Sequence, residues 1–288
     1  MTQPSYLEAR ANLSGRAAMI IGGAGGLGRA CTIDLARAGV DVAVLDRDRL
    51  ALESTSDECR SAGHRVLTHV GDARDEQVLA AFFDQVDREF GRLDVLLNVV
   101  GGTFLQPFSD STPRGWDALM RANFVWLLHA IHLAIPRLRA RGGGSIISIT
   151  SIEGHRAGPG VAIYAAMKAA VTNLSRSLAV ELASDGIRVN TIAPDLAPHE
   201  GTATHASFGT GSVWTEDDAS RFAVTIPMGR TGTAHDVSGC ALFLASDLSS
   251  YVTGTSIHPD GGTLAASGWL NWPEVGYSNL PPASAPRS

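Results

Sequence analysis

The chain has 288 residues, of which 44% are hydrophobic and 18% charged, so it can bury a substantial core and is not expected to be disordered. Its formal charge of −6 lacks the basic excess that a nucleic-acid surface needs. Three widely spaced cysteines, the absence of a secretory signal pattern and the absence of a run of about 18 apolar residues argue against secretion and membrane insertion. We expect a cytoplasmic protein that binds neither nucleic acid nor membrane.

Short apolar runs alternate with helical periods along most of the chain. This rhythm is typical of an α/β fold, a parallel sheet with helices on both faces. Because no repeat or linker interrupts the alternation, we expect a single domain. Strands are expected at 17–23, 40–46, 64–72, 93–101, 144–151, 187–194 and 255–262, and helices at about 28–38, 48–62, 76–90, 117–139, 162–184 and 234–246.

Three segments differ from this pattern. The domain is expected to span residues 15–267. Residues 1–14 are expected to be an N-terminal extension, and residues 268–288 a C-terminal tail that docks through Trp269 and Trp272 and then frays. Within the domain, residues 195–230 are rich in Asp, Gly, Ser and Thr, which is typical of a mobile lid.

A glycine-rich loop lies between the first expected strand and helix. Gly22, Gly26 and Gly28 allow a tight turn and a close approach of phosphate oxygens to the helix N-terminus, although glycine triplets also occur in ordinary turns. Asp46 ends the next strand, where a carboxylate can accept both ribose hydroxyls and repel a 2′-phosphate. The loop predicts a dinucleotide site and Asp46 predicts NAD rather than NADP, while the adjacent Arg47 leaves NADP open.

Tyr164 and Lys168 form the most informative pair. Lys168 is the only lysine among 23 basic residues, which suggests chemistry that arginine cannot perform. Four positions on a helix place both side chains on one face. A neighbouring ammonium favours phenolate and lowers the pKa of the phenol toward the neutral range. The pair predicts a tyrosine that acts as acid and base.

Two other polar residues can complete this site. Ser151 ends an apolar run and can hold a substrate oxygen, or cap a helix or turn. Asn123 interrupts an apolar helical stretch and can hold a water or a carbonyl in a proton relay, or be a satisfied core amide. Nine histidines are scattered, and His129 and His132 lack a convincing third ligand, so no metal is expected.

The order of glycine loop, strand-end Asp, Asn-x-x-Gly, helical Asn, Ser and Tyr-x-x-x-Lys resembles the single-domain branch of the short-chain dehydrogenase/reductase family, from about Gly15 to Gly262. The resemblance implies a doubly wound (Rossmann) parallel sheet of about seven strands, a nicotinamide cofactor and a homotetramer, or a homodimer. It implies a catalytic set of Ser151, Tyr164, Lys168 and Asn123. The cofactor-binding positions that it implies are Gly22, Gly26, Leu27, Gly28, Asp46, Asp72, Ala73, Asn98, Gly101, Tyr164, Lys168, Pro194 and Leu196.

The sequence also departs from the family's pattern. Ile21 stands where the family usually has Thr, and Val99 and Val100 replace Asn and Ala in the Asn-x-x-Gly motif. Asp195 and His199 occupy the places of a Gly and of a Thr that touches the cofactor phosphates. Either the lid follows a different path, using Thr202 or Thr204, or the nicotinamide end is held differently.

The expected function is NAD-dependent hydride transfer between a nicotinamide and a secondary alcohol or ketone. Aromatic lid residues, Phe208 and Trp214, favour an apolar or cyclic substrate. The alternative enzyme is an NADPH-dependent reductase of 3-oxoacyl thioesters, which the stretch before Gly262 also resembles. The alternative of another class is a non-catalytic dinucleotide-binding protein.

Overall fold

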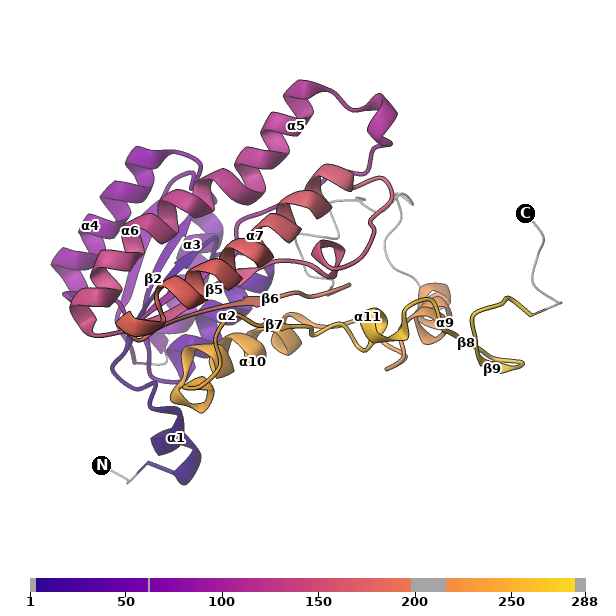
Figure 1. Cartoon of the computed structure of the whole chain (residues 1–288). Helices are drawn as coiled ribbons and strands as arrows, with labels where there is room; N and C mark the ends of the chain where they lie inside the picture. The colour runs from indigo at the N-terminus through magenta and orange to yellow at the C-terminus, as the bar shows by residue number, and fades with distance from the viewer. Residues whose placement is uncertain (1–3, 62, 198–215, 283–288) are drawn as a thin grey trace.

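The structure, a computed structural model, describes residues 4–61, 63–197 and 216–282, without the side chains of 216–219. Its centre is one parallel sheet with the strand order β3-β2-β1-β4-β5-β6-β7 (Figure 1). This confirms the doubly wound α/β sheet of about seven strands. The strands are β1 (Ala17–Ile21), β2 (Asp41–Asp46), β3 (Val66–Val70), β4 (Val95–Asn98), β5 (Gly144–Ile149), β6 (Ile187–Ile192) and β7 (Ser256–Ile257).

Helices follow the strands in the expected order. The helices longer than one turn are α1 (Tyr6–Ala11), α2 (Gly26–Arg37), α3 (Arg49–Ser61), α4 (Glu76–Phe90), α5 (Pro113–Met120), α6 (Trp126–Arg141), α7 (Ala162–Glu181), α9 (Glu216–Thr225) and α10 (Ala234–Ala245). Shorter elements are the π-turn η2 (Arg121–Val125), the 3₁₀ turns η1 (Phe108–Asp110), η3 (Ile152–Gly154), η4 (Ala183–Asp185) and η5 (Asp247–Ser249), and α11 (Thr263–Ala266).

Alternating side chains of the strands build two cores, one on each face of the sheet. Met19 and Ile21 of β1 pack into the core covered by α4, α6 and α7. Ala18 and Ile20 pack into the other core, which α2, α3 and α10 cover. Because both faces are covered, β1 is buried throughout, as its unbroken apolar sequence predicts.

The expected helix at 117–139 is longer than predicted and is not uniform. It begins at Pro113, is interrupted by η2, and continues to Arg141. Contrary to the expectation from the sequence, the run Pro113–Arg141 is long and apolar enough by length and hydropathy to cross a membrane. Trp126, Leu127 and Ala130 are buried in the core, however, so one apolar face of α6 packs as in the core helix of an α/β domain.

The last strand is much shorter than the strand-like run expected at 255–262. Pairing stops after Ile257, since Pro259 has no backbone N–H and Asp260 folds the chain into a turn. The Asp260 carboxylate accepts the backbone N–H groups of Gly262 and Leu264, both at 2.9 Å. This turn directs the chain toward the C-terminal segment.

The described part of the tail forms an antiparallel hairpin of β8 (Leu270–Trp272) and β9 (Gly276–Ser278). Strand β8 contacts α9, next to which it lies in Figure 1. Trp272 is partly buried in this hairpin, whereas Trp269 is 51% exposed. The predicted fraying at 283–288 lies outside the described residues.

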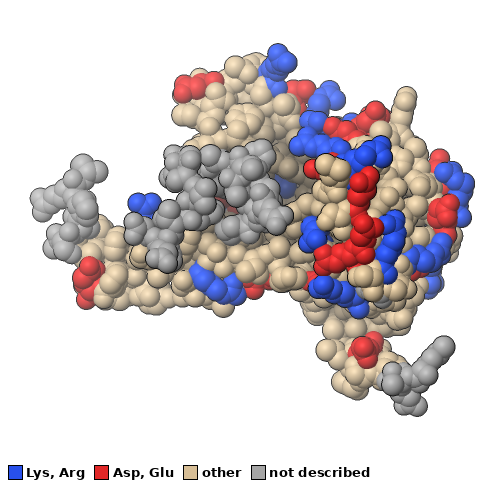
Figure 2. Space-filling view, turned by 180° about the vertical axis from the view of Figure 1, so that it is seen from behind, with Lys and Arg blue, Asp and Glu red and all other residues tan. Residues whose placement is uncertain are grey.

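Charged side chains of both signs are interspersed on the surface. On the face seen in Figure 2, Lys and Arg side chains lie among Asp and Glu side chains and do not form a broad basic field. This distribution agrees with the net charge of −6.

Candidate active site

The glycine loop joins β1 to α2 at the carboxyl edge of the sheet. Gly22 has a φ of +85°, and its N–H donates to Leu45 O at 2.7 Å. A Cβ atom on Gly28 would stand 1.9 Å from Gly22 O, so only glycine allows the first turn of α2 to approach the loop this closely. Gly26 and Leu27 lie in the same turn, and Gly25 at the N-cap has no side chain to cap the helix. The amide groups at this N-terminus fit a phosphate group.

Asp46 ends β2 beside this loop, as the sequence predicts. Its carboxylate accepts the N–H of Ala24 at 3.1 Å and the N–H of Asp48 at 3.2 Å. The acid is thereby attached to the glycine loop at the position where the ribose of a dinucleotide is expected.

Asp72 and Ala73 follow β3 at the same edge. Arg74 contacts both carboxylate oxygens of Asp72, with Nε at 3.0 Å from each, and this pairing lowers the pKa of Asp72. Ala73 is buried, 3% exposed. The charge of Arg47 also acts on Asp72, so two guanidinium groups lie near the end of β2 and β3.

Ser151, Tyr164 and Lys168 come together at the ends of β5 and α7. Lys168 is buried, and its Nζ donates to Ile149 O at 3.0 Å and lies 5.5 Å from the centre of the Tyr164 ring. Ser151 is 8% exposed and caps η3 by accepting the N–H of Glu153 at 3.2 Å, so the capping role considered for it is present. A hydrogen bond between the Ser151 and Tyr164 side chains completes the cluster.

The electrostatics of the pair differ from the expectation. Burial lowers the pKa of Lys168 to about 8. Burial also raises the pKa of Tyr164, which the hydrogen bond with Ser151 partly opposes. The prediction that Lys168 lowers the pKa of Tyr164 is therefore wrong for this structure, because removal of the phenol from water is the larger effect.

Asn123 borders the same cluster from the π-turn η2. Its Nδ2 donates to Gly102 O at 2.8 Å and Leu119 O at 3.0 Å, and its Oδ1 accepts the N–H of Gly102 at 3.1 Å. A Cβ on Gly101 would stand 2.9 Å from Asn123 Oδ1 and 3.1 Å from Lys168 Nζ. The hydrogen bonds of the Asn123 amide are thus made to backbone groups, as considered for a core amide. The amide also lies close to the Lys168 ammonium.

Three other predicted cofactor positions lie at the ends of β4 and β6. Asn98 is 1% exposed, and its Nδ2 donates to Ser148 Oγ at 3.3 Å inside the sheet, so its side chain joins β4 to β5. Pro194 O accepts the N–H of Ile152 at 3.1 Å, and Leu196 O accepts the N–H of Gly232 at 2.8 Å. Of these three, Pro194 is the one tied to the loop that carries Ser151.

Asp195 is directed toward protein groups. Its Oδ1 lies 3.7 Å from the guanidinium of Arg156. Burial raises the pKa of Asp195, whereas Arg156 lowers it. This partner explains how the chain carries an acid where glycine is usual. The lid residues His199, Thr202, Thr204, Phe208 and Trp214 lie outside the described residues.

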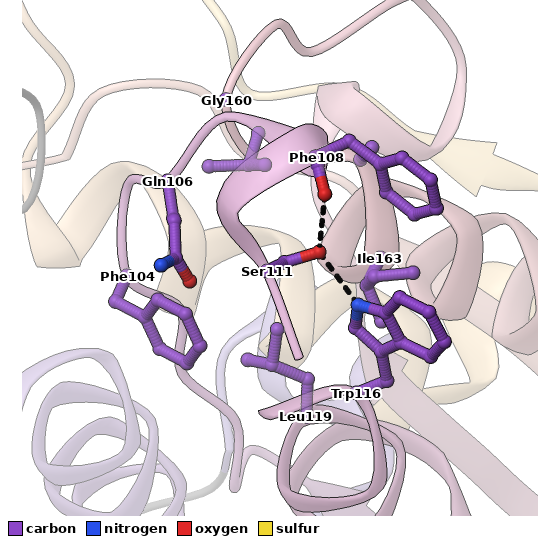
Figure 3. A pocket seen from close by; sticks show the side chains of 10 residues that line it. Phe104, Gln106, Phe108, Ser111, Trp116, Leu119, Gly160 and Ile163 are labelled. Atoms are coloured by element: carbon purple, nitrogen blue, oxygen red, sulfur yellow. Dashed lines mark hydrogen bonds between the residues drawn. The ribbon is translucent and has the colours of Figure 1, made fainter. Parts of the chain in front are cut away.

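A small pocket lies beside the cluster of Ser151, Tyr164 and Lys168, between the loop after β4, α5 and the first turn of α7 (Figure 3). Phe104, Trp116, Leu119 and Ile163 contribute apolar walls, and Trp116 Nε1 donates to Ser111 Oγ at 2.6 Å. Its volume of about 20 Å³ is enough for roughly one water molecule, so this pocket does not hold a substrate.

The sequence analysis missed Glu153 and Arg156, which carry opposite charges beside Ser151. Arg156 Nη2 donates to Glu153 Oε1 at 2.8 Å. The spacing of three residues between an acid and a base could have indicated an ion pair. The spacing could not indicate that η3 places this ion pair beside Ser151. Within the described residues, no group of three or more His, Cys, Asp or Glu side chains could hold a metal ion.

Comparison with known proteins gives consistent matches over most of the chain. A family model described as enoyl-(acyl carrier protein) reductase matches residues 22–263. A tropinone reductase homolog of Arabidopsis thaliana is 35% identical over 258 residues, 88% of this chain and 92% of the relative. The 3-oxoacyl-(acyl-carrier-protein) reductase FabG of Thermotoga maritima is 32% identical over 253 residues, 88% of this chain and 99% of the relative.

Solved structures give the same result. A 7α-hydroxysteroid dehydrogenase in complex with NADH and 7-oxo glycochenodeoxycholic acid has a TM-score of 0.81 at 30% identity. The alignment covers 91% of this chain and 98% of that protein. The fold and the sequence therefore resemble the same group of enzymes over nearly the whole chain.

Proposed function

Because the chain belongs to the short-chain dehydrogenase/reductase family of oxidoreductases, we propose that it transfers a hydride between a nicotinamide cofactor and a secondary alcohol or ketone. The observation that carries this proposal is the cluster of Ser151, Tyr164 and Lys168 beyond the carboxyl end of β5, with Asn123 and Gly101 beside the Lys168 ammonium. A phenol, a hydroxyl and an ammonium arranged in this way fit proton transfer to one substrate oxygen.

In this mechanism each side chain has a separate task. Tyr164 takes the proton of the substrate hydroxyl, and Ser151 donates a hydrogen bond to the same oxygen. Lys168 is fixed by Ile149 O and binds the nicotinamide ribose, while Asn123 holds the Gly101–Gly102 segment against Lys168. The nicotinamide supplies the hydride acceptor in oxidation and the donor in reduction. In reduction Tyr164 returns the proton, so the same residues serve both directions.

We propose NAD as the cofactor. The amide groups of the α2 N-terminus and the close approach of Gly28 to Gly22 fit the pyrophosphate, and Asp46 fits the ribose hydroxyls. Arg47 and Arg74 support the competing choice, NADP, because guanidinium groups bind phosphate well. Initial rates with NADH and NADPH test this assignment, and a preference for NADPH would contradict it.

The substrate proposed is an apolar or cyclic alcohol or ketone. The likeness to a 7α-hydroxysteroid dehydrogenase supports a cyclic substrate, whereas the likeness to FabG supports the alternative, a 3-oxoacyl thioester reduced with NADPH. Two assays distinguish these substrate classes. One follows the formation of NADH from NAD with a panel of cyclic secondary alcohols, and the other follows the consumption of NADPH with a 3-oxoacyl thioester.

The decisive test of the mechanism is Tyr164→Phe. We expect this variant to lose turnover while binding NADH as the wild type does, since the ring remains and only the hydroxyl is removed. Lys168→Arg is expected to fail as well, because a guanidinium cannot replace the compact ammonium in a buried site. Near-normal rates in either variant would remove the catalytic roles. NADH binding with no turnover of any substrate would favour a non-catalytic dinucleotide-binding protein.

We also propose a homotetramer, or a homodimer, located in the cytoplasm. Apolar side chains remain exposed on the long helices after the chain has folded: Leu128 of α6 is 38% exposed and Val180 of α7 is 80% exposed. Burying such faces between copies is favourable. Light scattering coupled to size exclusion measures the oligomeric state, and a monomer at micromolar concentration would contradict the proposal.

A further inference from the structure

An ion pair lies directly behind the proposed catalytic serine. The N–H of Glu153 donates to Ser151 Oγ, and the Glu153 carboxylate accepts from Arg156 Nη2 at 2.8 Å and from Nε at 3.3 Å. The Glu153 side chain is 15% exposed and that of Arg156 is 37% exposed. The pair is therefore held at the edge of the site, with the acid on its inner side.

The carboxylate of Glu153 lies near the first turn of α7, which carries Tyr164. A Cβ on Gly158 would stand 3.2 Å from Glu153 Oε2 and 3.7 Å from the Cβ of Ala165, the residue after Tyr164. A negative charge here opposes phenolate formation. In agreement with this geometry, the charge of Glu153 adds to burial in raising the pKa of Tyr164.

Arg156 counteracts that charge. Its guanidinium pairs with Glu153 and lies 3.7 Å from Asp195 Oδ1, so one cation serves two acids from different segments. Charged groups around the phenol and this pair come from four elements: Glu153 and Arg156 from η3 and the turn after it, Lys168 from α7, Asp195 from the end of β6, and Asp260 from the turn after β7.

We propose that Glu153 and Arg156 are positioning residues for the catalytic phenol: the acid biases Tyr164 toward its protonated form, and the guanidinium screens that bias. The inference rests on the proposed function of Tyr164 as acid and base. Neither side chain touches the reacting atoms. Each acts through the charge that Tyr164 experiences and through the loop that holds Ser151.

The test compares the pH dependence of alcohol oxidation in three variants. Oxidation requires phenolate, so the rate rises with pH as Tyr164 loses its proton. Glu153→Gln removes a negative charge and is expected to shift this rise to lower pH. Arg156→Gln removes the positive charge beside Glu153 and Asp195 and is expected to shift the rise of the rate to higher pH. We expect each variant to shift the rise by roughly half a pH unit or more. The matched control is Arg139→Gln, which removes a remote 2.7 Å pair with Asp185 and should shift nothing.

Opposite shifts are the discriminating result, because mere loosening of the loop would lower both rates without moving the two profiles apart. Unchanged profiles, or shifts of the same sign, would overturn the inference. Ultraviolet titration of tyrosinate, with Tyr164→Phe subtracted as the blank, measures the same shifts without turnover and applies even when a variant has a low rate. If Tyr164→Phe itself remains active, the proposed function fails. If it is inactive but the shifts are absent, only this inference fails.

Discussion

Replacing Lys168 by Met tests how the fold tolerates a buried ammonium. The side chain is 4% exposed, and burial lowers its pKa from 10.5 to about 8. The unfolded chain keeps the higher value and binds more protons between these two pH values, so the free energy of unfolding should rise as the pH increases from about 8 to 10.5. The pKa difference corresponds to a destabilisation of about 3 kcal/mol at pH 7, and linkage reduces it to about 1 kcal/mol at pH 10.

Urea unfolding of the wild type and of Lys168→Met at both pH values measures this effect. The lost hydrogen bond to Ile149 O and the changed packing contribute at both, so the comparison between pH values isolates the charge. We expect the stability of Lys168→Met relative to the wild type to fall by about 2 kcal/mol between pH 7 and pH 10. A relative stability that stays within about 0.5 kcal/mol would refute the burial argument. Arg139→Gln serves as the surface control, with no such change expected.

Three other changes test the remaining parts of the site. Gly28→Ala should weaken NADH binding at least roughly tenfold, because its Cβ would stand 1.9 Å from Gly22 O; fluorescence titration measures this, and unchanged affinity would contradict the phosphate site. Asn123→Ala should lower the free energy of unfolding by roughly 2–4 kcal/mol, since it removes the three hydrogen bonds that this side chain makes to the backbone of Gly102 and Leu119; urea unfolding checks it, and a loss below about 0.5 kcal/mol would be inconsistent. Asp46→Ser should raise kcat/KM for NADP relative to NAD by roughly tenfold, and an unchanged ratio would show that the acid does not select the cofactor.

The framework of the protein is largely predictable from its apolar pattern. The run at 17–21 alternates between two buried faces, so it could only be a strand covered on both sides, and the helix at 76–90 begins and ends where its sequence predicts. The expected seven-stranded sheet followed from the family resemblance and is confirmed. Strand β7 was overestimated, because the expected run at 255–262 was extended past Pro259 and Asp260, where the pairing has already ended.

The site was only partly predictable, for an electrostatic reason. The spacing of Tyr164 and Lys168 predicted their proximity, which the 5.5 Å separation confirms. The spacing could not predict the direction of the pKa shift of Tyr164, because that depends on burial by segments distant in sequence. Similarly, the sequence showed that Asp195 departs from the family's pattern, but it could not show that the carboxylate lies 3.7 Å from the guanidinium of Arg156.

The π-turn η2 fixes the phase of the long helix across the site. A π-turn holds one residue more than an α-helical turn, and each residue rotates an α-helix by about 100°. Without the extra residue, α5 and the loop it supports would be rotated by that angle relative to α6, whose Trp126 and Leu127 are locked in the core. The number of residues between Gly102 and the core is therefore constrained, as is the identity of Asn123. A single-residue deletion in α5 should misalign the Asn123 amide relative to Gly102, even though every side chain of the cluster is retained.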